Sequence, residues 1–108
     1  MGAAVERRAR WFYRLRGYRI LDANASAGGN ELDIVLRRGR RLVFCEVKMK
    51  ADGRFGDPLE MVGHTKRGRI RHAAEAWLGH HAELRELEVE FEVLAERAGR
   101  LERLRAAF

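Results

Sequence analysis

The stretch ELDIVLRRGRRLVFCEVK, residues 31–48, determines the fold that the rest of the chain is expected to adopt. Apolar and polar residues alternate over residues 31–37, and a second run of strand-like composition covers residues 41–48. A period of two is typical of a β-strand with one buried face. Arg38-Gly39 lies between the two runs and favours a tight turn, so the stretch predicts an antiparallel hairpin.

The acidic residues of this hairpin are predicted to converge on one face of the sheet. A turn at residues 38–39 places Glu31 opposite Glu46 and makes Asp33 a diagonal neighbour of Glu46. Lys48 follows Glu46 on the same face. A register that differs by one residue would separate these side chains. The alternative interpretation is a solvated polar face with a Glu46–Lys48 ion pair, which adds little to stability.

Carboxylates gathered on one sheet face repel one another and lose hydration unless a cation neutralises them. Oxygen ligands of this kind suit Mg²⁺ or Mn²⁺. A metal held by Asp33 and Glu46 would polarise a phosphodiester and activate water, and Lys48 would orient that water or stabilise the developing charge. The pattern predicts a metal-dependent nuclease whose catalytic residues are Asp33, Glu46, Lys48 and Glu31.

The remaining segments indicate a single α/β domain, residues 1–108, with a central mixed β-sheet flanked by helices. The expected elements are a helix over 3–16, a short strand over 18–21, a turn-rich loop over 22–30, a long functional loop over 49–63, a helix over 65–78, a half-buried strand over 87–93 and a last short strand within 100–108. In the first helix, Val5, Ala9, Phe12 and Leu15 have helical spacing and predict its buried face, and Trp11 is also expected in the core.

The second helix is predicted to face a phosphate. Lys66, Arg67 and Arg69 crowd its first turns, where cations oppose the helix dipole, and Thr65 is the expected N-cap. A helix N-terminus with this chemistry suits an anion, so these basic residues are assigned to the nucleic-acid backbone. The alternative is a solvated basic face that is tolerated because packing dominates helix stability.

The overall charge points to an anionic partner. The chain has 22 Lys and Arg against 16 Asp and Glu, a formal net charge of +6 and a pI near 10.4. Nucleic acid is the first expectation, and arginines that only solvate the surface are the alternative. Cys45 is the only cysteine, which excludes an intrachain disulfide. No apolar run approaches the ~20 residues that span a membrane, so the expected location is the cytoplasm.

Several short motifs together resemble the YraN family of bacterial proteins, within the restriction-endonuclease-like PD-(D/E)xK superfamily. They are Gly17-Tyr18-Arg19-Ile20-Leu21, Glu31-Leu32-Asp33, Leu42-Val43-Phe44-Cys45-Glu46-Val47-Lys48, Phe55-Gly56-Asp57-Pro58, Lys66 with Arg69, and Ala107-Phe108. The resemblance implies a restriction-endonuclease-like fold in which Asp33 and Glu46 bind a divalent metal and Lys48 assists catalysis. By similarity to archaeal-type Holliday junction resolvases, it also implies that Glu6 on the first helix approaches the metal.

The chain departs from the family pattern at three places. Asn30 stands where the family has glycine before the Glu31 motif, Cys45 replaces a valine, and Met49-Lys50 stands where Thr-Arg is commoner. The metal-binding acids are retained, whereas the substrate contacts around Met49 differ; Lys50 is predicted to bind nucleic acid.

Three functions follow from these observations. The first is a metal-dependent endonuclease that hydrolyses nucleic-acid phosphodiester bonds, with structure-specific cleavage of DNA as one form. The alternatives are a nucleic-acid-binding module that does not cut, and a subunit of a DNA-processing complex. A homodimer would suit an enzyme that handles two strands, although no residue requires one.

Overall fold

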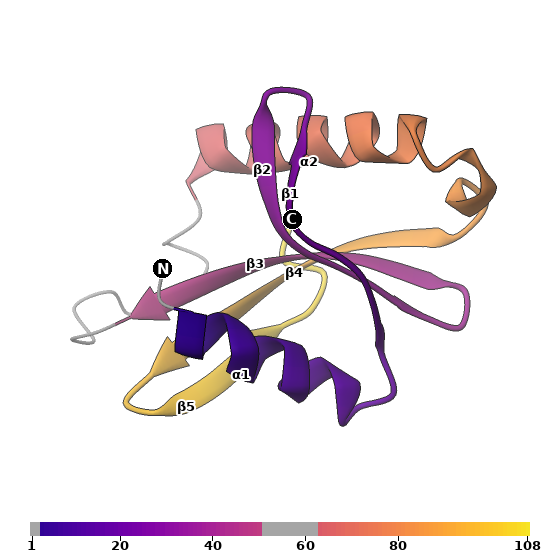
Figure 1. Ribbon diagram of the computed structural model, residues 1–108. Coiled ribbons are helices and arrows are strands. Elements are labelled where there is room, and N and C mark those ends of the chain that lie inside the picture. The colour runs from indigo at the N-terminus through magenta and orange to yellow at the C-terminus, as the bar shows by residue number, and fades with distance from the viewer. Residues whose placement is uncertain (1–2, 51–62) are drawn as a thin grey trace.

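The computed structural model of the protein describes residues 3–50 and 63–108 (Figure 1). Its elements are α1 (Ala3–Arg14), β1 (Arg19–Ala27), β2 (Asn30–Arg38), β3 (Arg41–Lys50), α2 (His64–Gly79), the short 3-10 helix η2 (Ala82–Leu84), β4 (Glu88–Arg97) and β5 (Arg100–Leu104). None of these helices has the length and apolar character needed to cross a membrane. The predicted loop over 49–63 lies largely outside the described residues.

The five strands form one mixed sheet in the order β1-β2-β3-β4-β5. Neighbouring strands are antiparallel except β3 and β4, which are parallel and are connected through α2. In Figure 1, α1 and α2 lie on opposite sides of the sheet. The predicted α/β architecture, a mixed sheet flanked by helices, is confirmed.

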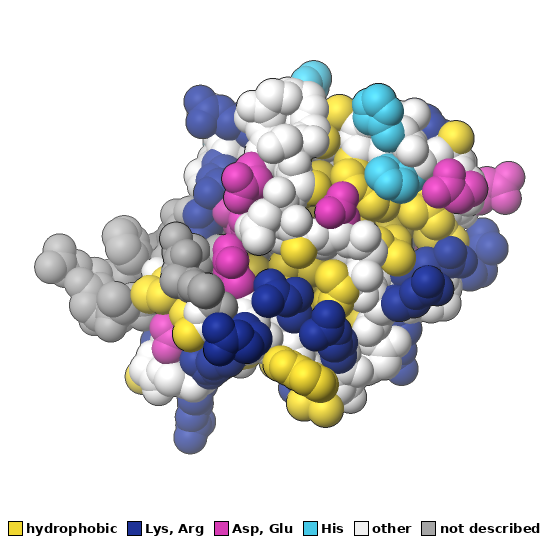
Figure 2. All heavy atoms as spheres, viewed as in Figure 1, with side chains coloured by type: hydrophobic (Ala, Val, Ile, Leu, Met, Phe, Trp, Pro, Cys, Tyr) yellow, Lys and Arg dark blue, Asp and Glu magenta, His cyan; other side chains and the backbone are white. Residues whose placement is uncertain are grey.

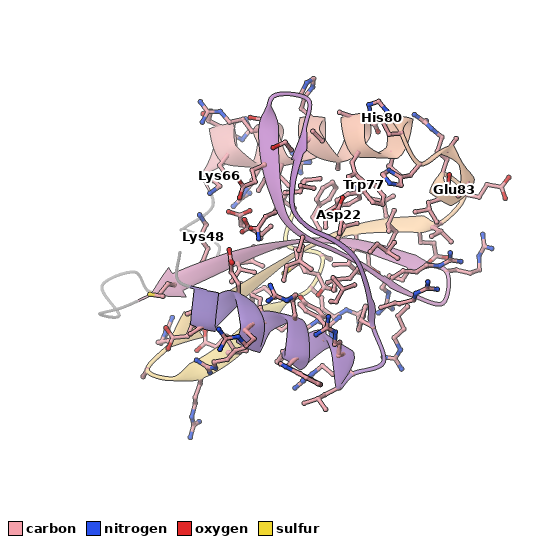
Figure 3. All side chains as sticks on the ribbon, in the orientation of Figure 1. Asp22, Lys48, Lys66, Trp77, His80 and Glu83 are labelled. Carbon is pink, nitrogen blue, oxygen red and sulfur yellow. The ribbon has the colours of Figure 1, made fainter. Side chains whose placement is uncertain are left out.

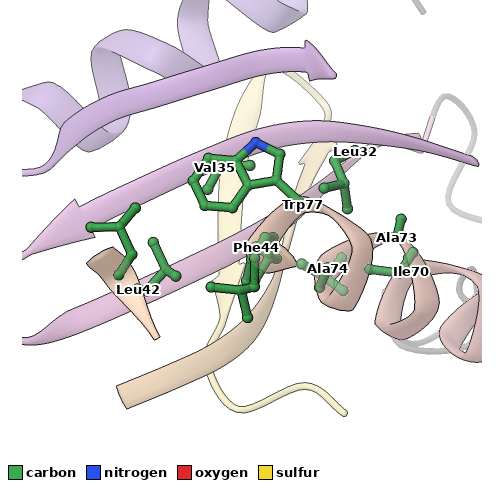
Figure 4. Close-up of a cluster of buried hydrophobic side chains, with 11 residues drawn as sticks. Leu32, Val35, Leu42, Phe44, Ile70, Ala73, Ala74 and Trp77 are labelled. Carbon is green, nitrogen blue, oxygen red and sulfur yellow. The ribbon is translucent and has the colours of Figure 1, made fainter. Parts of the chain in front are cut away.

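The core on the α2 side is built around two aromatic rings (Figure 4). Phe44 of β3 and Trp77 of α2 meet edge to face, with their ring centroids 5.8 Å apart. Trp77 is buried, and its indole nitrogen donates a hydrogen bond of 2.9 Å to Asp22 on β1. The pair therefore fixes α2 against β3 and β1 at the same time.

The core on the α1 side contains a buried polar network. Tyr13 is fully buried, and its hydroxyl lies 2.9 Å from a carboxylate oxygen of Glu92 and 3.2 Å from the sulfur of Cys45. Arg103 donates two hydrogen bonds to the same carboxylate, at 2.8 and 2.9 Å. The half-buried strand expected over 87–93 is therefore wrong at Glu92, because α1 and Arg103 cover that side of β4.

The buried face of α1 also differs from the predicted one. Val5 and Ala9 are buried as expected, but the third buried position is Tyr13 and not Leu15. Side chains four residues apart share one side of a helix, so Trp11 and Leu15 point together to the opposite side. The expectation that Trp11 belongs to the core is wrong, since 54% of its surface is exposed.

β1 is longer than the sequence indicates and forms a hairpin with β2 that packs on α2. The predicted loop over 22–30 is wrong, because β1 continues to Ala27 after an irregularity between Ile20 and Asp22. Gly28 has φ +57°, and a Cβ atom there would lie 2.9 Å from the ring of His72. The hairpin tip can approach α2 this closely only with glycine at residue 28.

Candidate functional site

The β2–β3 hairpin keeps the acids on one face although its register differs from the prediction. Its turn consists of Gly39 and Arg40, since Arg38 pairs with Arg41, and Gly39 has φ +59°. The predicted turn at residues 38–39 is therefore wrong. The strands are displaced by two residues from the predicted pairing, and an even displacement preserves which side chains share a face.

Asp33 and Glu46 are adjacent across this hairpin. The last paired residues are Ile34 and Cys45, and Asp33 and Glu46 come next along their strands. The backbone amide of Val47 donates a hydrogen bond of 2.9 Å to a carboxylate oxygen of Asp33, which holds that side chain beside β3. Glu46 is buried, with 5% of its surface exposed.

Two lysines from different elements, Lys48 and Lys66, are labelled in Figure 3, and both contact the carboxylate of Glu46. The Nζ atoms of Lys66, in the first turn of α2, and Lys48, on β3, lie 2.7 and 3.2 Å from the same oxygen, Oε1 of Glu46. Lys66 was predicted to contact the nucleic-acid backbone, and the structure places it among the acids. A spacing of four from the buried Ile70 would have indicated this inward direction.

These side chains line two adjoining hollows, which we name together the carboxylate pocket. One hollow is lined by Asn30, Glu31, Asp33, Glu46, Lys66, Arg69 and Ile70, and the other by Glu6, Glu31, Asp33, Glu46, Val47, Lys48, Met49 and Lys66. Glu6 is carried into the pocket by α1. Figure 2 shows acidic side chains gathered on this face with basic ones beside them.

Glu31 occupies the rim of the carboxylate pocket. Its predicted position opposite Glu46 is wrong, because Ile34 pairs with Cys45 and this register brings Asp33, not Glu31, opposite Glu46. It is exposed, whereas Asp33 is partly buried and Glu46 is buried. The structure therefore places Glu31 nearer to solvent than the two central acids.

The carboxylate pocket shifts the pKa values of three of its ionisable side chains. Burial and, secondarily, the charge of Glu46 raise the pKa of Asp33 to about 7, against the opposing hydrogen bond from Val47. Burial and the neighbouring Lys66 lower the pKa of Lys48. Hydrogen bonds with Glu46 and Lys48 raise the pKa of Lys66 although burial opposes this. Perturbed groups of this kind are common at functional sites.

The chemistry of the donors fits a hard divalent cation. Asp33 and Glu46 offer carboxylate oxygens from adjacent strands, and burial together with the neighbouring charge of Glu46 raises the pKa of Asp33, which a bound cation would oppose. Within residues 3–50 and 63–108, no three His, Cys, Asp or Glu side chains stand in a ready-made ligand group. Lys66 supplies positive charge to Glu46 in this arrangement.

The other predicted contacts lie around this pocket or outside the described chain. Arg69 lines the side of the pocket next to Asn30, and Arg67 is half-buried on α2. The expected N-cap, Thr65, is wrong: α2 begins at His64, and Gly63 occupies the cap without a side-chain hydrogen bond. The side chain of Lys50 and the motif 55–58 lie outside the described residues.

Comparisons with known proteins give a consistent result. The sequence model of the uncharacterised protein family UPF0102 matches residues 5–101. A UPF0102 protein of Xanthomonas euvesicatoria is 42% identical over 93 residues, which cover 86% of this chain and 76% of the relative. The UPF0102 protein YraN of Salmonella agona is 32% identical over 108 residues, covering 99% and 82%. A relative from Burkholderia vietnamiensis is 41% identical over 110 residues, covering 100% and 75%. The resemblance to the YraN family is confirmed.

Proposed function

This chain belongs to the uncharacterised protein family UPF0102, and we propose that it is a divalent-metal-dependent nuclease that hydrolyses phosphodiester bonds in its carboxylate pocket. The observation that carries the proposal is the juxtaposition of Asp33 and Glu46 on adjacent strands with two lysine ammonium groups on one carboxylate oxygen. Bringing Asp33 and the two ammonium groups to the buried Glu46 costs desolvation, which a catalytic role would explain.

Asp33 and Glu46 would hold Mg²⁺ or Mn²⁺, with Glu6 and Glu31 close enough to assist from the edge of the pocket. The bound metal would act as a Lewis acid toward the phosphate and lower the pKa of a water. The proposal includes a restriction-endonuclease-like fold, supported by the mixed sheet between α1 and α2 and by the Glu46-Val47-Lys48 end of β3.

The basic side chains have separate roles in this proposal. Lys48 lies beside Glu46 and would stabilise negative charge that develops on the reacting phosphate. Arg69, on the outer side of the pocket, and Arg67 and Lys50 would hold the neighbouring phosphates of the nucleic acid. The surplus of positive charge, +6 over the chain, favours a nucleic acid as the cytoplasmic substrate.

A second candidate is a nucleic-acid-binding module that does not cut. The observation that favours it is the pairing of Glu46 with both Lys48 and Lys66, which compensates the buried charge without a metal. This candidate predicts salt-dependent binding that survives Lys48→Ala and is never followed by cleavage.

The test is cleavage of single-stranded, duplex, flap and four-way-junction DNA, and of matching RNA, with Mg²⁺ or Mn²⁺. We expect cleavage by the unaltered protein and its loss in Asp33→Asn and Lys48→Ala. Glu75→Gln is the matched control, because Glu75 is exposed on α2 and lines neither hollow of the pocket. Circular dichroism and thermal unfolding establish that each variant is folded. Failure to cut any substrate with either metal contradicts the proposal.

A further inference from the structure

The outer side of α1 exposes large apolar side chains. Trp11 is 54% exposed and Leu15 is 78% exposed. They border a shallow groove between α1 and β5, whose other lining residues include Arg7, Arg8, Phe12 and Leu101. Figure 2 shows apolar side chains standing out on the α1 side of the molecule among basic ones. Exposed apolar surface that is rimmed by charge commonly marks an interaction site.

The same surface is strongly basic. The arginines on or directly after α1 are Arg7, Arg8, Arg10, Arg14 and Arg16, against the single acid Glu6. In the described part of the chain, no ion pair with an acidic side chain involves any of these arginines. Arg7 and Arg8 lie in the first half of the helix, where positive charge opposes the helix dipole. Helix stability therefore does not explain them.

Aromatic and cationic groups are interleaved on this face. The guanidinium of Arg14 lies 5.5 Å from the centre of the Trp11 ring, and that of Arg16 lies 3.5 Å from the centre of the Phe12 ring. Arg8 donates a hydrogen bond of 2.7 Å to the backbone of Gly99, which ties this side of α1 to the β4–β5 turn. An indole ring beside guanidinium groups suits base stacking with neighbouring phosphate contacts.

The basic face reaches the carboxylate pocket around the same helix. Glu6 lines that pocket, and Arg10 follows Glu6 one turn later. Trp11 lies about 8 Å further along the axis than Glu6 and about 140° around it, given an α-helix of ~3.6 residues per turn. A nucleic-acid strand that leaves the pocket would therefore pass around α1, over Arg10 and Arg7, before it meets the exposed indole.

We infer that the outer face of α1 binds a single-stranded segment of nucleic acid, with a base stacked on Trp11 and phosphates held by the surrounding arginines. This inference rests on the proposed function. It adds a binding site for the part of the nucleic acid that lies beyond the reacting phosphate. A twofold pairing of two copies through this face would oppose arginine to arginine, so charge complementarity favours an anionic partner.

The chain carries its own probe for this inference. Trp11 is exposed whereas Trp77 is only 4% exposed, so a quencher that reaches the surface reports mainly on Trp11. In EDTA, where no cleavage occurs, oligothymidylate should quench the tryptophan fluorescence and protect it from iodide. Trp11→Phe should abolish this signal. The anisotropy of a labelled oligothymidylate should show about tenfold weaker binding by Trp11→Ala, with Trp11→Phe in between.

The outcomes separate this inference from the proposed nuclease. Unchanged Trp11 fluorescence at saturating oligothymidylate, or equal affinity of Trp11→Ala, overturns the inference whether or not the protein cuts. A response to an acidic peptide but not to oligothymidylate also overturns it and assigns the face to a protein partner. If Asp33 and Glu46 do not bind Mn²⁺, the proposed nuclease activity is contradicted, whereas binding of oligothymidylate at Trp11 is unaffected. Glu75→Gln serves again as the control for folding.

Discussion

The Nζ atom of Lys66 lies 2.7 Å from Oε1 of Glu46 and joins the start of α2 to the end of β3. The ammonium group therefore supplies positive charge at the carboxylate that we propose as a metal ligand. A divalent cation that binds Glu46 would compete with this ion pair.

Replacing Lys66 with methionine should strengthen Mn²⁺ binding. The substitution keeps an unbranched side chain and removes the charge that competes for Glu46, so we expect the dissociation constant to fall by about threefold to tenfold. Titration calorimetry, or electron paramagnetic resonance of free Mn²⁺, measures this directly. Lys66→Arg is the matched control and should resemble the unaltered protein. Weaker binding by Lys66→Met would show that Lys66 assists the metal and does not compete with it.

The stability of the protein should depend on the protonation of Asp33. Its pKa is raised to about 7, mainly by burial and then by Glu46, while a carboxyl in an unfolded chain has a pKa of ~4. The folded state retains a proton that the unfolded state releases, so this contribution to stability is present at low pH and is lost as the pH rises through about 7. Asp33→Asn should therefore be more stable than the unaltered protein by about 2 kcal/mol near pH 8, a value reduced for solvent screening.

Urea unfolding across the pH range measures this difference for Asp33→Asn. The advantage of the variant should shrink as the pH falls from about 7 and disappear below pH ~3, where Asp33 is protonated in both states. Glu75→Gln, which alters an exposed acid, should show no comparable trend. If the difference in free energy of unfolding between the two proteins is the same at low and high pH, ionisation of Asp33 does not destabilise the fold.

Removing Arg103 should destabilise the sheet strongly. Glu92 is fully buried and takes two hydrogen bonds from Arg103, so Arg103→Met leaves a buried charge without its main partner. We expect the free energy of unfolding to fall by about 3 kcal/mol. The double variant Glu92→Leu with Arg103→Met should recover part of that loss, because it removes both charges. Arg100→Met, at an exposed position of the same strand, should change stability little.

Gly28 and Gly29 form a matched pair at the β1–β2 turn. Both have positive φ, +57° and +77°, but only Gly28 is crowded: a Cβ atom would lie 2.9 Å from His72 and 3.1 Å from Ala76. Gly28→Ala should cost about 2–4 kcal/mol through backbone strain and overlap, and Gly29→Ala about 1 kcal/mol through strain alone. His72→Ala combined with Gly28→Ala should restore part of the loss in urea unfolding. Equal costs at the two glycines would contradict this packing.

The sequence predicts correctly that Asp33, Glu46 and Lys48 share a face of the sheet. This depends only on whether the register differs from the predicted one by an even or an odd number of residues. The turn lies at residues 39–40 instead of the predicted 38–39, which displaces the pairing by two residues and keeps the acids together. By contrast, which acid faces Glu46 depends on the register itself, and the observed register places Asp33 there instead of Glu31. The alternation of side chains is set within each strand, whereas the pairing of residues between two strands depends on the position of the turn.

The parts that could not be predicted are fixed by distant residues. Tyr13 and Leu15 both continue a helical stripe from Val5 and Ala9, and Tyr13 is buried because its hydroxyl has partners 32 and 79 residues away along the chain. β1 contains alanines, which are weak strand formers, and extends because it pairs with β2 and packs on α2. Tertiary contacts overrode local preference in both cases.

The position of Cys45 beneath Tyr13 gives the protein a built-in reporter of its own opening. The thiol is buried, and burial raises its pKa, so the docked helix shields it from alkylating reagents. The rate at which Cys45 is alkylated therefore reports how often α1 detaches from the sheet by local unfolding. Because that helix carries both Glu6 and Trp11, a ligand that engages either residue should slow the labelling of this one cysteine.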